Sequence, residues 1–248
     1  MSVTAWHQRI DSFYLPPGLG FHSQMGRPAA ERREELIELY REVQQCQRCP
    51  LYATRTQVVF GSGNADADLM FVGEAPGFHE DQQGKPFVGA AGKLLDTLLG
   101  EIGMAREDVF IANVLKSRPP GNRDPQPDEI EACKPYLARQ VELIEPLVIC
   151  TLGNFATKCL TRRQDGITRV HGRPQDHVIA SLPIRIYPIY HPAAGLRSTA
   201  MLETLRQDFQ RLPELLEAAR PQATGHGPQD DAESAGGSAA VDQLGLFA

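Results

Sequence analysis

The chain has 248 residues, a net charge of −6 and 42% apolar residues, which is enough for one sizeable α/β domain with a buried core and tails. No apolar run approaches the roughly 20 residues of a membrane span, and the first residues lack a secretory signal, so a cytoplasmic protein is expected. Removing the four acids of residues 221–248 leaves 27 acidic residues against 25 basic ones. The chain therefore has no overall positive charge that would attract DNA, so any DNA binding must use a local patch of basic residues.

Residues 1–30 contain several prolines and glycines without a sustained period and are expected to form an irregular arm. Residues 31–219 alternate helical and strand patterns. Helices are expected around 36–43, 94–102, 130–144 and 202–212, and strands around 58–60, 69–72, 109–114, 147–152 and 184–190. Strands separated by such helices predict a parallel sheet covered by helices on both faces, an α/β fold of three layers.

The C-terminal part of the sequence differs in composition. Residues 220–242 are rich in Pro, Gln, Gly, Ser, Ala and Asp and nearly lack large apolar side chains, so they are expected to be disordered. Residues 243–248 are apolar again, beginning with the string QLGLF.

The most informative stretch is 73–89, GEAPGFHEDQQGKPFVG, between an apolar run and a helical pattern. A loop at the carboxyl end of a strand is where open α/β sheets bind ligands. Its backbone amides, its acids and the ring of Phe87 suit a small planar polar ligand, although the glycines alone favour a simple strand–helix turn. The whole string resembles the first motif of the iron–sulfur (type 4) uracil-DNA glycosylases.

Two further segments are similar to motifs of that family. Residues 113–123, NVLKSRPPGNR, form a basic loop stiffened by prolines, and residues 190–194, YHPAA, place a histidine after a strand. Alone, the first would be a solvated loop and the second a structural histidine. The resemblance covers about residues 34–217. It implies an α/β/α fold around a central four-stranded parallel sheet, and a monofunctional enzyme that flips uracil out of DNA, hydrolyses its N-glycosidic bond and leaves an abasic site.

The cysteines suggest a metal centre. Cys46 and Cys49 have the spacing of a zinc or iron–sulfur pair, while Cys133 and Cys150 on their own read equally well as buried core residues. The family resemblance implies that all four ligate one 4Fe-4S cluster with a structural role. Cys159 lies outside that pattern and is interpreted as a core thiol.

The resemblance also assigns roles in the pocket. Phe87 would stack on the flipped base, Asn113 would read O4 and N3–H of uracil, and His191 would donate to O2 as negative charge develops there. The backbone around the base would come from Glu74, Ala75 and Pro76.

Other roles are less sharply defined. Glu80 would either position the attacking water or close the pocket against the thymine methyl group, because Ala75 occupies the place of the usual water-orienting side chain. Asn122 would shape its loop or contact DNA. DNA phosphates would meet Lys116, Arg118, Arg123, Arg197 and Ser198.

Two other classes of function are compatible with parts of the pattern: a protein of the same superfamily that binds uracil-DNA without turnover, and an iron–sulfur electron carrier. A monomer acting on single- and double-stranded uracil-DNA is expected. The final string resembles the peptide that binds the bacterial sliding clamp, with contacts from Gln243, Leu244, Leu246 and Phe247.

Overall fold

A computed structural model of the chain describes residues 27–220. Its sheet has six strands in the order β1-β3-β2-β4-β6-β5. The strands are β1 (Ser62–Gly63), β2 (Leu69–Gly73), β3 (Phe110–Asn113), β4 (Val148–Leu152), β5 (Gln175–Ile179) and β6 (Leu182–Ile189). The four central strands β3, β2, β4 and β6 are parallel, which confirms the expected sheet, and β1 and β5 add antiparallel edges.

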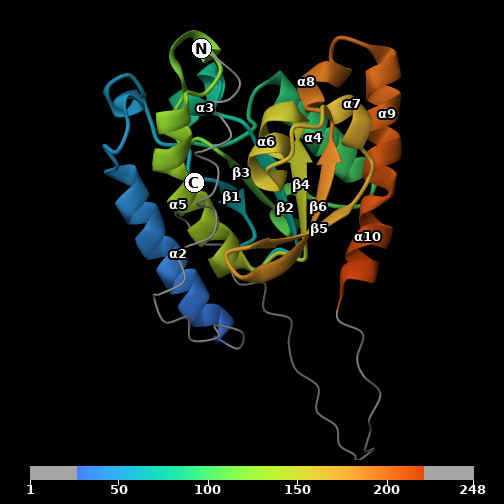
Figure 1. Cartoon of the computed structure of the whole chain (residues 1–248), viewed down its shortest axis with the longest axis horizontal. Coiled ribbons are helices and arrows are strands. Elements are labelled where there is room, and N and C mark those ends of the chain that lie inside the picture. The colour runs from blue at the N-terminus through green and yellow to red at the C-terminus, as the bar shows by residue number, and fades with distance from the viewer. Residues whose placement is uncertain (1–26, 221–248) are drawn as a thin grey trace, which may run out of the picture.

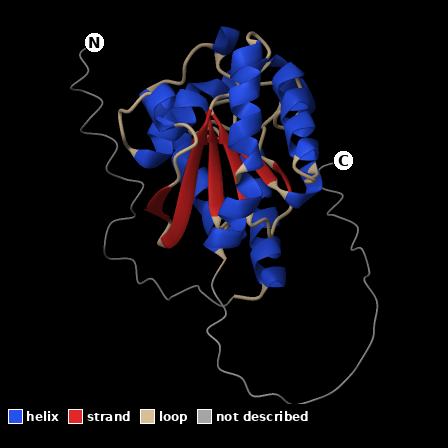
Figure 2. Cartoon of the chain, turned by 90° about the vertical axis from the view of Figure 1, so that its right-hand side faces the viewer, coloured by secondary structure: helices blue, strands red, loops and turns tan. Residues whose placement is uncertain are grey.

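Helices cover both faces of the sheet (Figures 1 and 2). The α-helices are α2 (Ala29–Gln44), α3 (Phe78–Gln83), α4 (Ala90–Glu101), α5 (Pro127–Ile144), α6 (Gly153–Thr161), α7 (Ile167–Val170), α8 (Pro192–Gly195), α9 (Thr199–Gln210) and α10 (Leu212–Ala219). Short 3₁₀ turns lie at η2 (Pro50–Ala53), η3 (Arg106–Asp108) and η4 (Pro120–Asn122). Helices α2, α5 and α6 contribute to one core cluster, and α4, α9 and α10 to the other.

Two predicted elements differ from the structure. Residues 58–60 are buried, and the Val59 amide donates to the Lys116 carbonyl at 2.8 Å, but the strand β1 begins only at Ser62. The last predicted helix is two helices, because α9 ends at Gln210 and α10 begins at Leu212, with Pro213 in its first turn. Proline has no N–H to continue the α9 hydrogen-bond ladder but is tolerated in a first turn.

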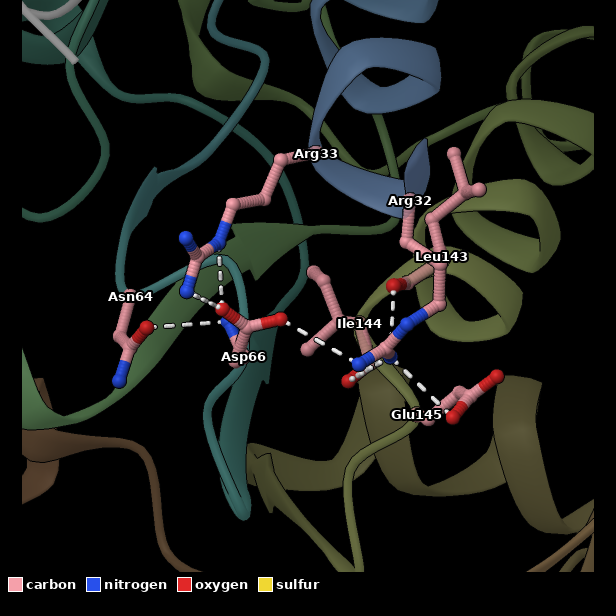
Figure 3. A network of polar contacts seen from close by, with 7 residues as sticks. All are labelled: Arg32, Arg33, Asn64, Asp66, Leu143, Ile144 and Glu145. Carbon is pink, nitrogen blue, oxygen red and sulfur yellow. Dashed lines mark hydrogen bonds and ion pairs between the residues drawn. The ribbon is translucent and has the colours of Figure 1, made fainter. Parts of the chain in front are cut away.

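A polar network fastens the start of α2 to the rest of the domain (Figure 3). Arg32 donates through Nη1 to the carbonyls of Leu143 (3.2 Å) and Ile144 (3.4 Å) at the end of α5. Arg32 also donates through Nη2 to Asp66 Oδ1 at 3.3 Å, and Arg33 donates through Nε to Asp66 Oδ2 at 2.6 Å. Helix α2 therefore lies along α5, and the chain that follows it reaches the carboxyl-end side of the sheet (Figure 1).

Candidate active site

The carboxyl ends of the four parallel strands bring separate segments together. Gly73 ends β2 and pairs in register with Asn113, which ends β3. Gly153 follows β4 at a φ of +88°, and a Cβ on it would lie 3.0 Å from Cβ of His191, which follows β6. Because all four strands are parallel, the three sequence motifs meet at one edge of the sheet, next to α3 and α8 in Figure 1.

An aromatic ring forms one wall of this site. The ring of Phe87 is buried and stacks against the His191 ring, with centroids 5.6 Å apart and planes at 28°. A Cβ on Gly73 would lie 2.7 Å from Phe87 Cζ and 2.4 Å from Asn113 Oδ1, so only glycine leaves room here. Phe87 adopts a φ of +52°, and Arg106 holds that turn by donating to the carbonyls of Pro86 and Phe87. The ring is therefore fixed before any ligand enters.

Asn113 carries the polar recognition group. Its side chain is 2% exposed, and Oδ1 has no hydrogen-bond partner among the described residues. A buried polar atom left unpaired costs about 1–3 kcal/mol, so such atoms normally meet a partner. Asn113 Oδ1 therefore indicates a ligand that brings a hydrogen-bond donor to this site.

The basic residue of the second motif lies under the site. Lys116 is 2% exposed, and its Nζ donates to the Asn113 carbonyl at 2.8 Å and to Gln140 Oε1 at 2.6 Å. Gln140 in turn donates to the Phe60 carbonyl at 2.9 Å. Burial lowers the pKa of Lys116 to about 7, an effect opposed by the nearby Cys133. The prediction that Lys116 contacts DNA is therefore wrong, because its charged end faces the core and supports the Asn113 loop.

His191 is set up as a neutral hydrogen-bond donor. Its Nδ1 accepts the Ala193 N–H at 3.1 Å, because His191 is the N-cap of α8. The proton of the neutral ring is therefore on Nε2. Burial lowers the pKa of His191 to about 4, although the charge of Glu80 opposes this shift. Near neutral pH the imidazole is uncharged and presents Nε2–H as a donor.

Glu80 binds the loop on which it lies. Its Oε1 accepts the N–H groups of Val88 and Gly89, both at 2.9 Å, and Gly89 is the N-cap of α4. Glu80 thus joins α3 to the start of α4. Burial, with a smaller contribution from Asp124, raises the pKa of the half-buried Glu74 carboxyl, while Pro76 is buried and Ala75 packs against the core.

The rim of the site carries exposed basic and apolar side chains. Arg118 Nε donates to Asn122 Oδ1 at 2.7 Å, and its guanidinium lies 5.2 Å from the Phe78 ring centroid. Phe78 is 53% exposed. Arg123 Nη1 donates to Oε2 of the buried Glu129 at 2.9 Å, so this guanidinium is tied to α5.

The segment after α8 completes the rim. Leu196, Arg197 and Ser198 are exposed, and Ser198 Oγ accepts the Met201 N–H as the N-cap of α9. Sequence reasoning missed the roles of Arg106, Gln140 and Phe78. For Phe78 the signal was available, because it is a large apolar residue inside a loop of glycines and acids.

Three of the predicted metal ligands lie on one side of the sheet. The thiols of Cys49 and Cys133 hydrogen-bond to each other, which lowers the pKa of Cys49 to about 6 and raises that of Cys133. The Cys46 thiol contacts the hydroxyl of Tyr136, one turn beyond Cys133 on α5. Cys159 packs against the same core, as expected for a core thiol.

Cys150 lies on the other side. It is fully buried in β4 and belongs to the core cluster of α9 and α10, whereas its strand neighbour Ile149 belongs to the cluster that contains Cys133. Consecutive strand residues point to opposite faces, so the sheet separates Cys150 from the other three thiols. The prediction that Cys150 is the fourth ligand is therefore wrong. Within residues 27–220, no group of three or more His, Cys, Asp or Glu side chains is arranged to hold a metal ion.

No helix formed by the described part of the chain is long and apolar enough to cross a membrane. The model of the uracil DNA glycosylase superfamily matches residues 60–216. The chain is 48% identical over 180 residues to a type-4 uracil-DNA glycosylase of Saccharolobus solfataricus, covering 71% of this chain and 83% of that one. It is 46% identical to the Archaeoglobus fulgidus enzyme (76% and 96% covered) and 47% identical to the Thermotoga maritima enzyme (67% and 86% covered), both also type-4 uracil-DNA glycosylases.

Proposed function

The chain belongs to the type-4 uracil-DNA glycosylases, DNA repair enzymes that hydrolyse an N-glycosyl bond, and we propose that its pocket of Phe87, Asn113 and His191 performs this reaction. As a uracil-DNA glycosylase it binds uracil-containing DNA. Uracil in a duplex is stacked and out of reach, so the nucleotide must rotate out of the helix into the pocket.

The observation that carries the proposal is the unpaired, buried Oδ1 of Asn113 beside the Phe87 ring. Uracil presents a donor at N3–H and an acceptor at O4 on one edge. An asparagine amide matches both, with Oδ1 accepting and Nδ2 donating. Cytosine has no proton on N3 and an amino group in place of O4, so it would leave the amide with mismatched partners. The base stacks on Phe87, and the backbone of residues 74–76 bounds its edge.

His191 stabilises the leaving group. As the bond between N1 and C1′ breaks, the electron pair stays with uracil and negative charge grows on its O2. The Nε2–H of the neutral His191 donates to this oxygen, and fixed donors of this kind are worth about 3–4 kcal/mol in the transition state. Water then adds its hydroxyl to C1′, its proton returns to solvent or to the uracil anion, and an abasic site remains.

Glu80 acts by holding the pocket's loop. Its Oε1 is engaged by two main-chain N–H groups, which is the arrangement of a structural carboxylate. In our proposal the positive charge on the sugar is stabilised mainly by the DNA phosphates. Around the pocket, Arg118, Arg123, Arg197 and Ser198 contact the DNA backbone, and Asn122 holds Arg118 in place.

Type-4 enzymes typically bind a 4Fe-4S cluster. We propose that this chain carries an iron–sulfur cluster with a structural role beside the second motif. The contact between the Cys49 and Cys133 thiols fits two neighbouring ligands, while Cys150 on the opposite face does not fit. When bound, the cluster would fasten the segment after α2 to α5 and to the Asn113 loop.

The proposed peptide that binds the sliding clamp, residues 243–248, lies outside the described residues. We propose that this peptide holds a cytoplasmic monomer near replicating DNA, and the string QLGLF supports its binding to the clamp. Binding of the purified replicative clamp to the full chain and to a version ending at Asp242 tests it. Equal affinity for both would rule the peptide out.

The catalytic proposal is tested with a uracil-containing oligonucleotide by measuring free uracil and alkali-sensitive strand breaks. Turnover should release uracil in excess of the enzyme and leave strands that break only after alkali. A stable complex of protein and uracil-DNA without free uracil would instead indicate the non-turnover binding protein. If the protein neither released uracil nor bound the oligonucleotide, both functions would be contradicted.

A further inference from the structure

One residue of the second motif has a buried hydroxyl that the uracil pocket does not use. Ser117 is 3% exposed, and its Oγ accepts from Nη1 of Arg55 at 3.3 Å. The preceding main-chain N–H, that of Lys116, donates to Cys133 Sγ at 3.4 Å. Ser117 is thus next in the chain to Lys116, whose main-chain N–H contacts the proposed metal ligand Cys133.

Arg55 connects this hydroxyl to the segment that carries Cys46 and Cys49. It follows Cys49 in the chain, and its Nη1 donates to Ser117 Oγ at 3.3 Å. Its Nη2 also donates to the Gln44 carbonyl at the end of α2 at 3.4 Å, just before Cys46. Three segments therefore converge here: the end of α2, helix α5 at Cys133, and the loop after β3.

Cys150, in contrast, lies on the opposite face of the sheet from these groups. Cys150 pairs in register with Phe71 and Tyr187, and all three belong to the core cluster on the far face. No rotation of its side chain brings its sulfur through the sheet, because the strand backbone fixes which face it points to.

We infer that the metal centre of this chain is bounded by three cysteines, Cys46, Cys49 and Cys133, and by the hydroxyl of Ser117, with Cys150 taking no part. The inference rests on the proposed iron–sulfur cofactor and assigns its ligands. Each thiol releases its proton to solvent as its sulfur binds iron, and Ser117 binds through an oxygen lone pair.

This ligand set has a chemical consequence. Iron–sulfur clusters favour soft thiolate ligands, and an alcohol oxygen is a harder and weaker ligand for them. The iron next to Ser117 should therefore be the one lost most easily. A thiol at that position should hold the cluster more firmly than the natural hydroxyl does.

The test compares full-length variants purified without oxygen, by iron and acid-labile sulfide per chain and by the decay of the visible absorbance in air. Cys150→Ala should keep the iron content of the wild type, as should the matched control Cys159→Ala. Cys49→Ala and Cys133→Ala should lose most of it. Ser117→Cys should slow the decay several-fold, and Ser117→Ala should quicken it. Thermal melts report whether each variant is folded.

Three results would overturn the inference: loss of iron in a folded Cys150→Ala protein, unchanged decay in both Ser117 variants, or an iron-free wild type. Uracil release by the same preparations separates this from the proposed function. An iron-free wild type that still excises uracil contradicts only the ligand assignment. An iron-loaded wild type that releases no uracil contradicts only the proposed activity.

Discussion

The Nζ of Lys116 donates to the main-chain carbonyl of Asn113 at 2.8 Å from inside the protein, so a buried lysine supports the residue that reads the base. Its second bond, to Gln140 Oε1, joins the pocket's loop to helix α5. Asn113 must present its amide in a fixed position, and Lys116 holds the backbone that carries it.

Lys116→Met should therefore impair both stability and activity. The change leaves the Asn113 carbonyl and Gln140 Oε1 unpaired, and each buried unpaired group costs about 1–3 kcal/mol. We expect a lower free energy of unfolding in denaturant titrations and a slower uracil release in the folded fraction. Lys93→Met, at an exposed site on α4, is the control and should change neither. Full activity and stability in Lys116→Met would show that the support is dispensable.

Gly73→Ala should close the pocket without unfolding the domain. The new methyl group would come within 2.4 Å of Asn113 Oδ1 and 2.7 Å of the Phe87 ring, where the base is placed. We expect uracil release to fall on the order of 100-fold, the effect of displacing one preorganised polar group. Gly100→Ala is a matched control, because a Cβ there meets nothing within 4 Å and an added methyl favours the α4 helix. An active Gly73→Ala enzyme would place the base elsewhere.

The lowered pKa of His191 predicts how the free energy of unfolding depends on pH. The folded-state pKa of His191 is lowered from 6.5 to about 4, so the unfolded chain takes up a proton there before the folded one does. The resulting loss of stability is absent above about pH 6.5 and grows as the pH falls from there toward 4. His191→Gln should remove this part of the acid sensitivity in denaturant titrations.

The same shift applies to catalysis. Since the neutral ring is the donor, the rate of uracil release should show no loss from His191 between pH 5 and 8, within the range where the ring stays uncharged. If the imidazolium were the active form, the rate would fall steadily as the pH rises through this interval.

Glu80 offers a test that separates two roles. The amide oxygen of Glu80→Gln can still accept the Val88 and Gly89 N–H groups, whereas Glu80→Ala cannot. We expect Gln to keep the rate of uracil release within several-fold and Ala to lose far more. Equal loss in both variants would mean that the carboxylate charge itself is needed, as for a residue that activates water.

The sequence predicted the site well for residues at the carboxyl ends of the parallel strands. Gly73 and Asn113 end parallel strands and His191 follows another, and such strand ends must meet at one edge of the sheet. It failed for Cys150, because spacing along the chain does not say which face a strand residue points to. It failed for Lys116 because a lysine in a basic run reads as a surface residue. Its burial depends on Gln140 and on the Phe60 carbonyl, both distant in sequence.

The most direct measurement is the rate of free uracil release by Asn113→Ala and His191→Ala from a single-stranded uracil oligonucleotide, under single-turnover conditions and beside the wild type. Both variants should remain folded in thermal melts and release uracil about 100-fold more slowly or worse, because each lacks one fixed group that meets the base or the charge developing on it. A Lys93→Met variant, altered at an exposed site on α4, should keep the wild-type rate. Wild-type rates in folded Asn113→Ala or His191→Ala protein would contradict the pocket assigned here.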